Sequence, residues 1–326
     1  MGARIAVARP MICNPDRTIV LSSLGWVDHD ALWVFDARAD TSETVPLDSG
    51  ARHVSLHARG ADRFSVHHHY DGKRFEVTVR LISRPTEVIA RAWVEEARHG
   101  LWGDAAAWTD VPRLYVGYLA FAPWKDSVLI RVLPSANDVE VQRLAWYDQR
   151  YDKDYQGIVE VLELPGESVA LVSVQRSSAL VLHDLQTGTA RRSVELRDRG
   201  GNPALKLSKS GEEIWASDYD TLVVIRRADW RVARSARLES ALTGTQRFIG
   251  DFSFAPDADL CAVARPFSGD VVGLDTVTLR ARCAVRLGQQ PIDVAALAGG
   301  EVVARDWKTG AVSRGRFAPI RSRRIE

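Results

Sequence analysis

The amino-acid sequence predicts an all-β fold, a seven-bladed β-propeller with four-stranded antiparallel blades. Short apolar runs rich in Val, Leu and Trp alternate with Gly, Asp and Ser, as strands alternate with turns. With 326 residues, the chain is long for one layered core but suits a ring of repeats. The apolar residue after each central polar turn recurs at intervals of 41 to 49 residues, with one interval of 64, at Leu32, Phe75, Val139, Leu180, Leu222, Val271 and Val312.

Seven groups of strands follow from this pattern. The clearest turn is Asp71-Gly72, because Asp-Gly between two alternating runs predicts a hairpin. In chain order, strands are expected at residues 18–21, 32–35 and 45–47; 53–57, 63–69, 75–82 and 87–94; 115–121, 127–132 and 139–144; 158–162, 168–174, 179–182 and a run ending at 196; 204–207, 213–216, 222–225 and 232–238; 252–254, 261–264, 271–274 and 281–287; and a run from 292, 302–304 and 312–317.

Two stretches depart from the period. Residues 95–112 interrupt it as an insertion with room for one short helical turn. The last group lacks a fourth strand, and we expect residues 5–8 to supply it, because an open sheet edge promotes aggregation. The chain is then one domain, 1–326, ending in a short basic tail at residues 318–326.

The run Leu180-Val181-Leu182-His183-Asp184-Leu185-Gln186-Thr187-Gly188 resembles a known signature, the strand-Asp-x-x-Thr-Gly repeat of bacterial YVTN-type and quinoprotein-dehydrogenase-like (WD40-like) propellers. The stretch Asp306-Trp307-Lys308-Thr309-Gly310 is similar to a shorter form of it. The sequence lacks both Tyr-Val-Thr-Asn and the Gly-His and Trp-Asp pairs of WD40 repeats. The resemblance therefore implies the propeller fold and no particular activity.

The charge balance excludes partners that need a strong global field. The formal net charge is +1, from 43 basic and 42 acidic residues, so we expect no nucleic-acid or membrane partner, and a monomer. Most of the positive charge is arginine, which is typical of a GC-rich genome and also favours bidentate contacts to carboxylates and phosphates.

Cysteine usage and the N-terminal residues predict a cytoplasmic protein. The three cysteines, Cys13, Cys261 and Cys283, are sparse and show no Cys-x-x-Cys pairing, as expected in a reducing compartment. The first residues contain no apolar core typical of a secretory signal. No run approaches the roughly twenty apolar residues of a membrane span.

One face of the predicted ring collects the chemistry. In antiparallel blades, the turns between second and third strands lie on the same side as the links between blades, and we call this side the top face. Arg176, Arg265 and Arg305 end second strands there and would suit a carboxylate, a phosphate or an acidic peptide. Alternatively, they pair with Asp218, Asp270 and Asp306 of neighbouring blades and only hold the ring together.

The leading interpretation is a binding module that holds an acidic protein segment or a small anionic ligand on the top face. Tyrosine and tryptophan there would add contact area at low entropic cost. No cofactor is predicted, since the sequence has no P-loop, dinucleotide fingerprint or His-Glu-x-x-His. The predicted ligand-binding residues are Gln175, Arg176, Asp218, Tyr219, Arg265, Asp270, Arg305, Asp306 and Trp307.

Histidines support two weaker alternatives. An enzyme, a hydrolase or lyase, would place its site in the central funnel of the same face, with His29 or His69 as general base and Asp218 to orient or protonate. Metal binding would need two adjacent strands to bring histidines together, but no carboxylate or cysteine spacing completes a recognised site, so none is predicted. The candidate ligands would be His53, His57, His67 and His69.

Overall fold

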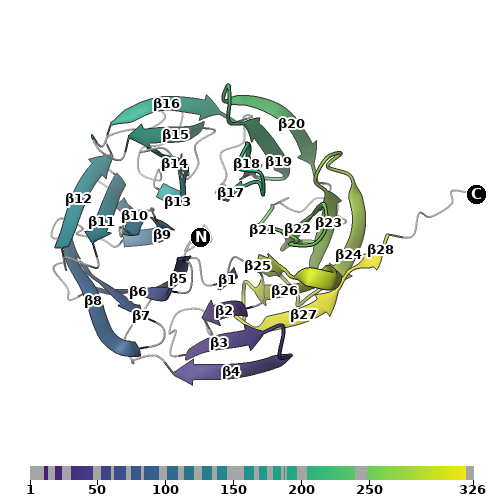
Figure 1. Ribbon diagram of the computed structural model, residues 1–326, viewed down its shortest axis with the longest axis horizontal. Coiled ribbons are helices and arrows are strands. Elements are labelled where there is room, and N and C mark those ends of the chain that lie inside the picture. The colour runs from purple at the N-terminus through teal and green to yellow at the C-terminus, as the bar shows by residue number, and fades with distance from the viewer. Residues whose placement is uncertain are drawn as a thin grey trace, which may run out of the picture.

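The strands of the computed structural model are arranged in sheets around a central axis (Figure 1). In each sheet the first strand in sequence lies nearest to the axis, and later strands lie progressively toward the rim (Figure 1). The structure describes residues 11–13, 19–23, 31–46, 53–59, 62–70, 75–81, 84–94, 101–108, 114–120, 127–133, 138–144, 158–164, 169–174, 179–184, 187, 189–196, 204–238 and 248–320.

Four sheets of four antiparallel strands make up the first part of the ring. They contain β1 (Met11–Cys13), β2 (Ile19–Ser23), β3 (Ala31–Asp36) and β4 (Thr41–Pro46); β5 (His53–Arg59), β6 (Asp62–Tyr70), β7 (Phe75–Leu81) and β8 (Arg84–Val94); β9 (Leu101–Trp108), β10 (Leu114–Ala120), β11 (Ser127–Leu133) and β12 (Asp138–Leu144); and β13 (Ile158–Glu163), β14 (Val169–Val174), β15 (Ala179–Asp184) and β16 (Ala190–Glu195).

Three further sheets complete the described strands. They contain β17 (Leu205–Leu207), β18 (Glu213–Asp218), β19 (Thr221–Arg226) and β20 (Arg231–Arg237); β21 (Phe252–Phe254), β22 (Leu260–Arg265), β23 (Asp270–Asp275), β24 (Ala281–Arg286) and β28 (Ala318–Pro319); and β25 (Pro291–Ala296), β26 (Glu301–Asp306) and β27 (Val312–Arg316). A short 3-10 helix, η2 (Ala298–Gly300), joins β25 to β26. Within the described ranges, no helix is long and apolar enough to cross a membrane.

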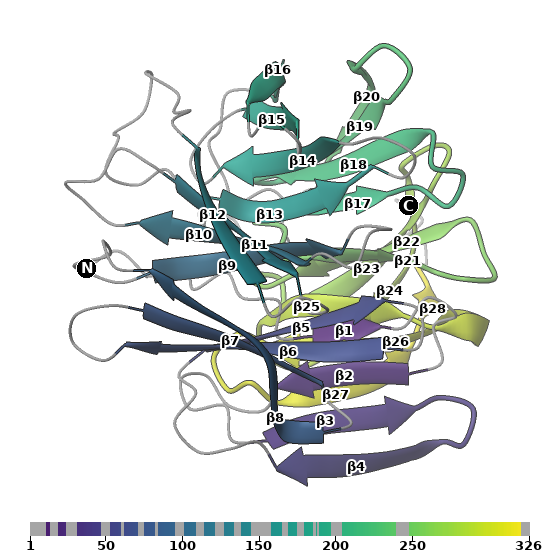
Figure 2. The same ribbon diagram turned by 60° about the vertical axis from the view of Figure 1, so that its left-hand side comes forward.

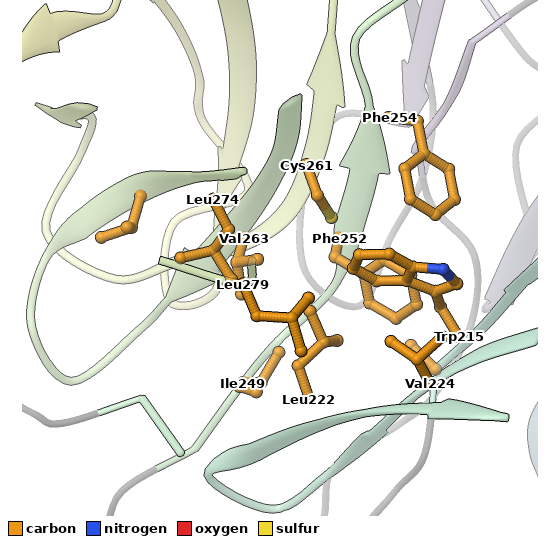
Figure 3. Packing of buried hydrophobic residues seen from close by; sticks show 12 residues of the cluster. Trp215, Leu222, Val224, Ile249, Phe252, Phe254, Cys261, Val263, Leu274 and Leu279 are labelled. Atoms are coloured by element: carbon orange, nitrogen blue, oxygen red, sulfur yellow. The ribbon is translucent and has the colours of Figure 1, made fainter. Parts of the chain in front are cut away.

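Packing between sheets explains the strand pattern. The second and third strands are buried on both sides because each sheet packs between two others, and β18 and β19 are accordingly buried along most of their length, with apolar residues at their centres. The fourth strand faces solvent, so β20 is mostly exposed and carries an arginine at every third position. Figure 3 shows one interface between sheets, where the ring edge of Trp215 meets Phe254 with centroids 5.0 Å apart, beside Phe252.

Most expected strands from residue 204 onward coincide with observed strands, but three segments differ from the sequence-based expectation. Residues 101–108, expected in an insertion with a helical turn, form β9 and pair with β10. Residues 11–13 form β1, the strand of its sheet nearest to the axis. The expected basic tail begins with β28, which pairs with β24 of the preceding sheet. Residues 5–8, which were expected to close the ring, lie outside the described residues.

Candidate functional site

The turns after β18, β22 and β26 lie on one side of the molecule. Each turn follows the second strand of its sheet, and the antiparallel order of the strands within every sheet directs all three turns toward the same side. Figure 2 shows the strands in side view, running across the molecule between its two faces. Backbone hydrogen bonds attach the links between sheets to these turns. Ile249 N donates to Tyr219 O at 2.7 Å, and Trp307 N donates to Gln290 O at 2.8 Å. This side is the predicted top face.

Three aromatic rings from three different segments meet on the top face. Phe248 precedes β21, Phe267 lies in the turn after β22, and Trp307 lies in the turn after β26. Their ring centroids are 6.5 Å apart for Phe248 and Phe267, 6.5 Å for Phe248 and Trp307, and 6.0 Å for Phe267 and Trp307. All three are half-buried, so the group, which we call the aromatic cluster, keeps part of its surface in solvent.

A small, shallow depression adjoins the aromatic cluster. Its floor combines apolar and charged groups from two sheets and the link between them. Among the charged groups, Asp220 is buried, with Oδ2 accepting from Arg237 Nε at 2.9 Å and Oδ1 accepting from Thr221 Oγ1 at 3.1 Å. The lining residues are Asp220, Leu238, Phe248, Ile249, Arg265, Phe267 and Ser268.

The two described arginines of the prediction are engaged by carboxylates of their own sheets. Arg265 donates twice to Asp270, from Nε to Oδ1 at 2.7 Å and from an Nη to Oδ2 at 2.5 Å. Arg305 is buried and lies 3.5 Å from Oδ2 of Asp293. Both arginines thus have a carboxylate partner, as the alternative of structural pairing expects, although neither partner comes from another sheet. Ligand binding by Arg265 and Arg305 stays a prediction. Arg176 and Gln175 lie outside the described residues.

The buried side chain of Asp306 joins two segments of the top face by hydrogen bonds. Its Oδ2 accepts from the amides of Gln289 at 3.0 Å and Gln290 at 2.7 Å, and its Oδ1 accepts from Lys308 and Thr309 amides at 3.0 Å. Burial acts to raise the pKa of Asp306, but the hydrogen bonds from Gln290, Thr309 and Gln289 outweigh it and hold the pKa below its usual range. The ionised carboxylate therefore fixes the turn that presents Trp307.

Tyr219 and Asp218 occupy the hairpin after β18. Asp218 pairs with Thr221 across a two-residue loop, and Tyr219 has a positive φ of 57°, a conformation that bulky side chains rarely adopt. Asp218 is buried, with 2% of its surface exposed. The enzyme alternative needs His29 or His69 beside it. His29 lies outside the described residues, and His69 is described only through the backbone of β6.

The backbone register bears on the histidine hypothesis. His53 pairs with His68, and Val54 pairs with His67. The histidine directly opposite His53 is therefore His68, and His67 and His69 are its two neighbours along β6. Among the side chains that the structure describes, no group of three or more His, Cys, Asp or Glu is placed to hold a metal ion. Metal binding by His53, His57, His67 and His69 stays a prediction.

Sequence reasoning missed Phe248 and the pairing of Asp220 with Arg237. Phe248 precedes β21 in a link without strand periodicity, and only the folded chain brings it to Phe267. Arg237 ends β20, and its place in the strand did not identify a partner. The sequence signal that could have indicated this pair is the polar hairpin that contains Asp220, because an antiparallel sheet places it beside the end of β20.

Comparisons with known proteins support the fold. No protein-family model and no curated protein matches the sequence. Among solved structures, the chain is similar to the β-propeller domain of Myceliophteria thermophila Cps50 (Swd1), with a TM-score of 0.69 and 11% identity over 97% of this chain and 98% of that one. It is also similar to a chain in the crystal structure of the mitotic checkpoint complex, with a TM-score of 0.69 and 8% identity over 96% of this chain and 91% of that one. These likenesses show that the chain has a β-propeller fold.

Proposed function

We propose that this protein is a cytoplasmic, monomeric, seven-bladed β-propeller that binds a protein segment on its top face. The observation that carries the proposal is the aromatic cluster, because three partly exposed rings from three segments offer the rigid apolar contact area that binding surfaces use. The solved propellers similar to it include a chain of a multiprotein complex, which agrees with this class of function.

The charges around the cluster favour a protein segment over a small anion. A small anion would need a guanidinium with uncompensated charge, whereas the charge of Arg265 is matched by Asp270 and Arg305 is buried beside Asp293. Lys308, exposed next to Trp307, leaves a positive charge at the rim of the cluster. We therefore expect an apolar or aromatic anchor in the partner, flanked by Asp or Glu, which keeps the acidic character predicted from the sequence.

A peptide selection tests this proposal. Peptides selected from a random library by the intact protein should carry a large apolar residue next to acidic residues. Trp307→Ala should weaken their binding at least tenfold, since removing a central aromatic anchor typically costs 2 kcal/mol or more, and Lys308→Glu should weaken it less. The readout is the dissociation constant by fluorescence anisotropy.

Val277→Ser is the matched control. Val277 is 69% exposed on the turn after β23, at the opposite end of its sheet from the top face, so its replacement should leave binding unchanged. Selected peptides that bind Trp307→Ala and the parent protein equally would place the site elsewhere. Binding of citrate or phosphate that depends on Arg265, with no peptide selected, would favour the small anionic ligand instead.

A further inference from the structure

The last sheet has one strand fewer than the others. β25, β26 and β27 form a three-stranded sheet, whereas each of the other sheets contains four or five described strands. β27 holds the third position of its sheet, and no described strand pairs with its outer edge (Figure 1). β19 and β23 hold the same position in complete sheets and are buried along most of their length, but β27 is half-buried or exposed at every residue.

The register shows which backbone groups of β27 point outward. At the start of the β26–β27 pairing, Asp306 N donates to Ala311 O at 2.8 Å. In an antiparallel pair, hydrogen-bonded positions alternate with positions whose backbone groups point to the opposite edge. From Ala311 onward, every second residue therefore bonds to β26. The residues that direct N–H and C=O groups to the outer edge are Val312, Arg314 and Arg316.

Two neighbouring sheets flank β27. On one face, a Cβ atom on Gly315 would lie 2.8 Å from Leu287, which directly follows β24. On the other face, Arg314 contacts Asp40 in the turn before β4, and its guanidinium lies over Phe35 at 4.6 Å. A strand added to the outer edge of β27 would extend the sheet between these two neighbours, with an apolar side toward β24 and a charged side toward β4.

The charged side is basic. Alternate residues of a strand share a face, so Arg316 lies on the same face as Arg314. Arg314 is bound by Glu301 and Asp40, whereas Arg316 is exposed and is bound by no carboxylate of the described residues. Opposite charges that face each other across two strands stabilise a sheet, and like charges destabilise it. The edge therefore favours a strand with Asp or Glu opposite the arginines.

The N-terminal segment of this chain fits the edge poorly. Residues 5–8, expected from the sequence to close the ring, lie outside the described residues and have Arg4 and Arg9 on either side. β1 begins at Met11 and packs against β25. The outer edge of β27 leads to a position three strand spacings, about 14 Å, beyond β25. The three residues from Ala8 to Met11 span at most about 11 Å.

A second copy of the chain fits no better. Two β27 strands that paired antiparallel about Arg314 would set the two Arg314 side chains directly opposite each other, with Arg316 nearby. This like-charge pairing is destabilising. The charges thus favour a different protein as the source of the strand.

We propose that the outer edge of β27 binds an extended acidic segment of a partner protein, which pairs with β27 as the fourth strand of the last sheet. The segment carries Asp or Glu at alternate positions, opposite Arg314 and Arg316, and apolar residues between them on the side of Leu287. This surface belongs to the outermost strand of its sheet and is separate from the aromatic cluster, so it does not depend on the proposed function.

A peptide selection with the full-length Trp307→Ala variant tests the proposal, because this variant lacks the anchor proposed for the top face. Decapeptides selected from a random library should carry acidic residues at every second position. Adding Arg316→Glu should weaken their binding at least tenfold, because it sets like charges opposite each other. Adding Val312→Pro should weaken it about tenfold, because proline removes an outward N–H but leaves the bonds to β26 in place. Fluorescence anisotropy measures the dissociation constants.

Ser235→Pro is the matched control. In β20, Leu238 N donates to Asp220 O at 2.7 Å, so the alternation directs the N–H of Ser235 away from the sheet, as it does for Val312. Its loss should leave peptide binding unchanged. The exposed substitution Arg316→Glu keeps the test decisive if Val312→Pro fails to fold.

Four results would overturn the proposal. The first is that no peptide is selected, and the second is that the selected peptides bind equally well after Val312→Pro and Arg316→Glu. The third is binding that appears only when Val7→Pro is added, which would assign the edge to residues 5–8. The fourth is a dimer of the parent protein that Val312→Pro dissociates, which would assign the edge to a second copy.

Discussion

His183 in the sheet β13–β16 and Asp293 in the sheet β25–β27 are two titratable groups that burial affects in opposite directions. His183 is 3% exposed, and burial lowers its pKa from 6.5 to about 4. Burial raises the pKa of Asp293 from 3.8 to about 7. Both shifts keep the group uncharged, the histidine by refusing a proton and the aspartate by retaining one. The same desolvation therefore gives opposite dependences of stability on pH.

The signs follow from proton linkage. For His183, the unfolded chain binds the proton more readily, so its contribution to stability is present above pH 6.5 and is lost as the pH falls through about 4. For Asp293, the folded chain binds the proton more readily, so its contribution is present below pH 3.8 and is lost as the pH rises through about 7. Between pH 4 and 6.5 the two contributions oppose each other, and the pair leaves the free energy of unfolding nearly flat.

Of the three substitutions, replacing His183 should cause the largest change in how the free energy of unfolding depends on pH. In His183→Leu, which keeps an apolar side chain of similar size, only Asp293 remains, and the free energy of unfolding should fall by roughly 4 kcal/mol between pH 4 and pH 7. Urea denaturation at several pH values measures this slope. A flat profile in the variant would show that Asp293 titrates normally in the folded protein.

Asp293→Asn should give the mirror image with a smaller amplitude. His183 then acts alone, and the free energy of unfolding should rise by roughly 3 kcal/mol between pH 4 and pH 6.5. The double variant, with both residues replaced, is the control and should return to a flat profile. If the double variant keeps the slope of either single variant, a third group is responsible for it.

Arg314→Gln should have the smallest effect and separates buried from exposed charge. Arg314 contacts Glu301 and Asp40, and its guanidinium lies over Phe35 at 4.6 Å, joining the last sheet to the first. Because 41% of the Arg314 side chain and 68% of the Asp40 side chain are exposed, the loss should be about 1 kcal/mol or less, reduced further by salt. Thermal unfolding at low and high ionic strength measures it. A loss of stability in Arg314→Gln as large as the change expected for His183→Leu would contradict the contrast between exposed ion pairs and buried titratable groups.

The sequence predicted where the strands lie better than it predicted which segments pair with them. The runs at 213–216, 222–225 and 261–264 were recognisable because the middle strands have apolar centres, and they lie within β18, β19 and β22. Residues 101–108 were missed because Leu-Trp-Gly-Asp-Ala-Ala-Ala-Trp contains no β-branched residue, and pairing with β10 overrides that weak propensity.

The candidate site was predicted in location more than in chemistry. Antiparallel geometry sufficed to assign Trp307 and Asp306 to one face. The partner of Arg305 is Asp293 rather than Asp306, because the pairing of β25 with β26 sets Asp293 opposite Arg305, a relation that residue spacing along the chain does not contain. Phe248 needed the fold for the same reason.

The crossing of the chain from β27 to β28 determines how this molecule bears load. A force applied at residue 320 first meets β28, which is registered with β24 through only Cys283 with Pro319 and Ala284 with Ala318. β27, paired along five residues with β26, is loaded only after β28 has peeled away. A tether attached on that side would therefore pull the outer rim of two adjacent sheets in sequence, with β28 acting as a weak link that yields before the ring.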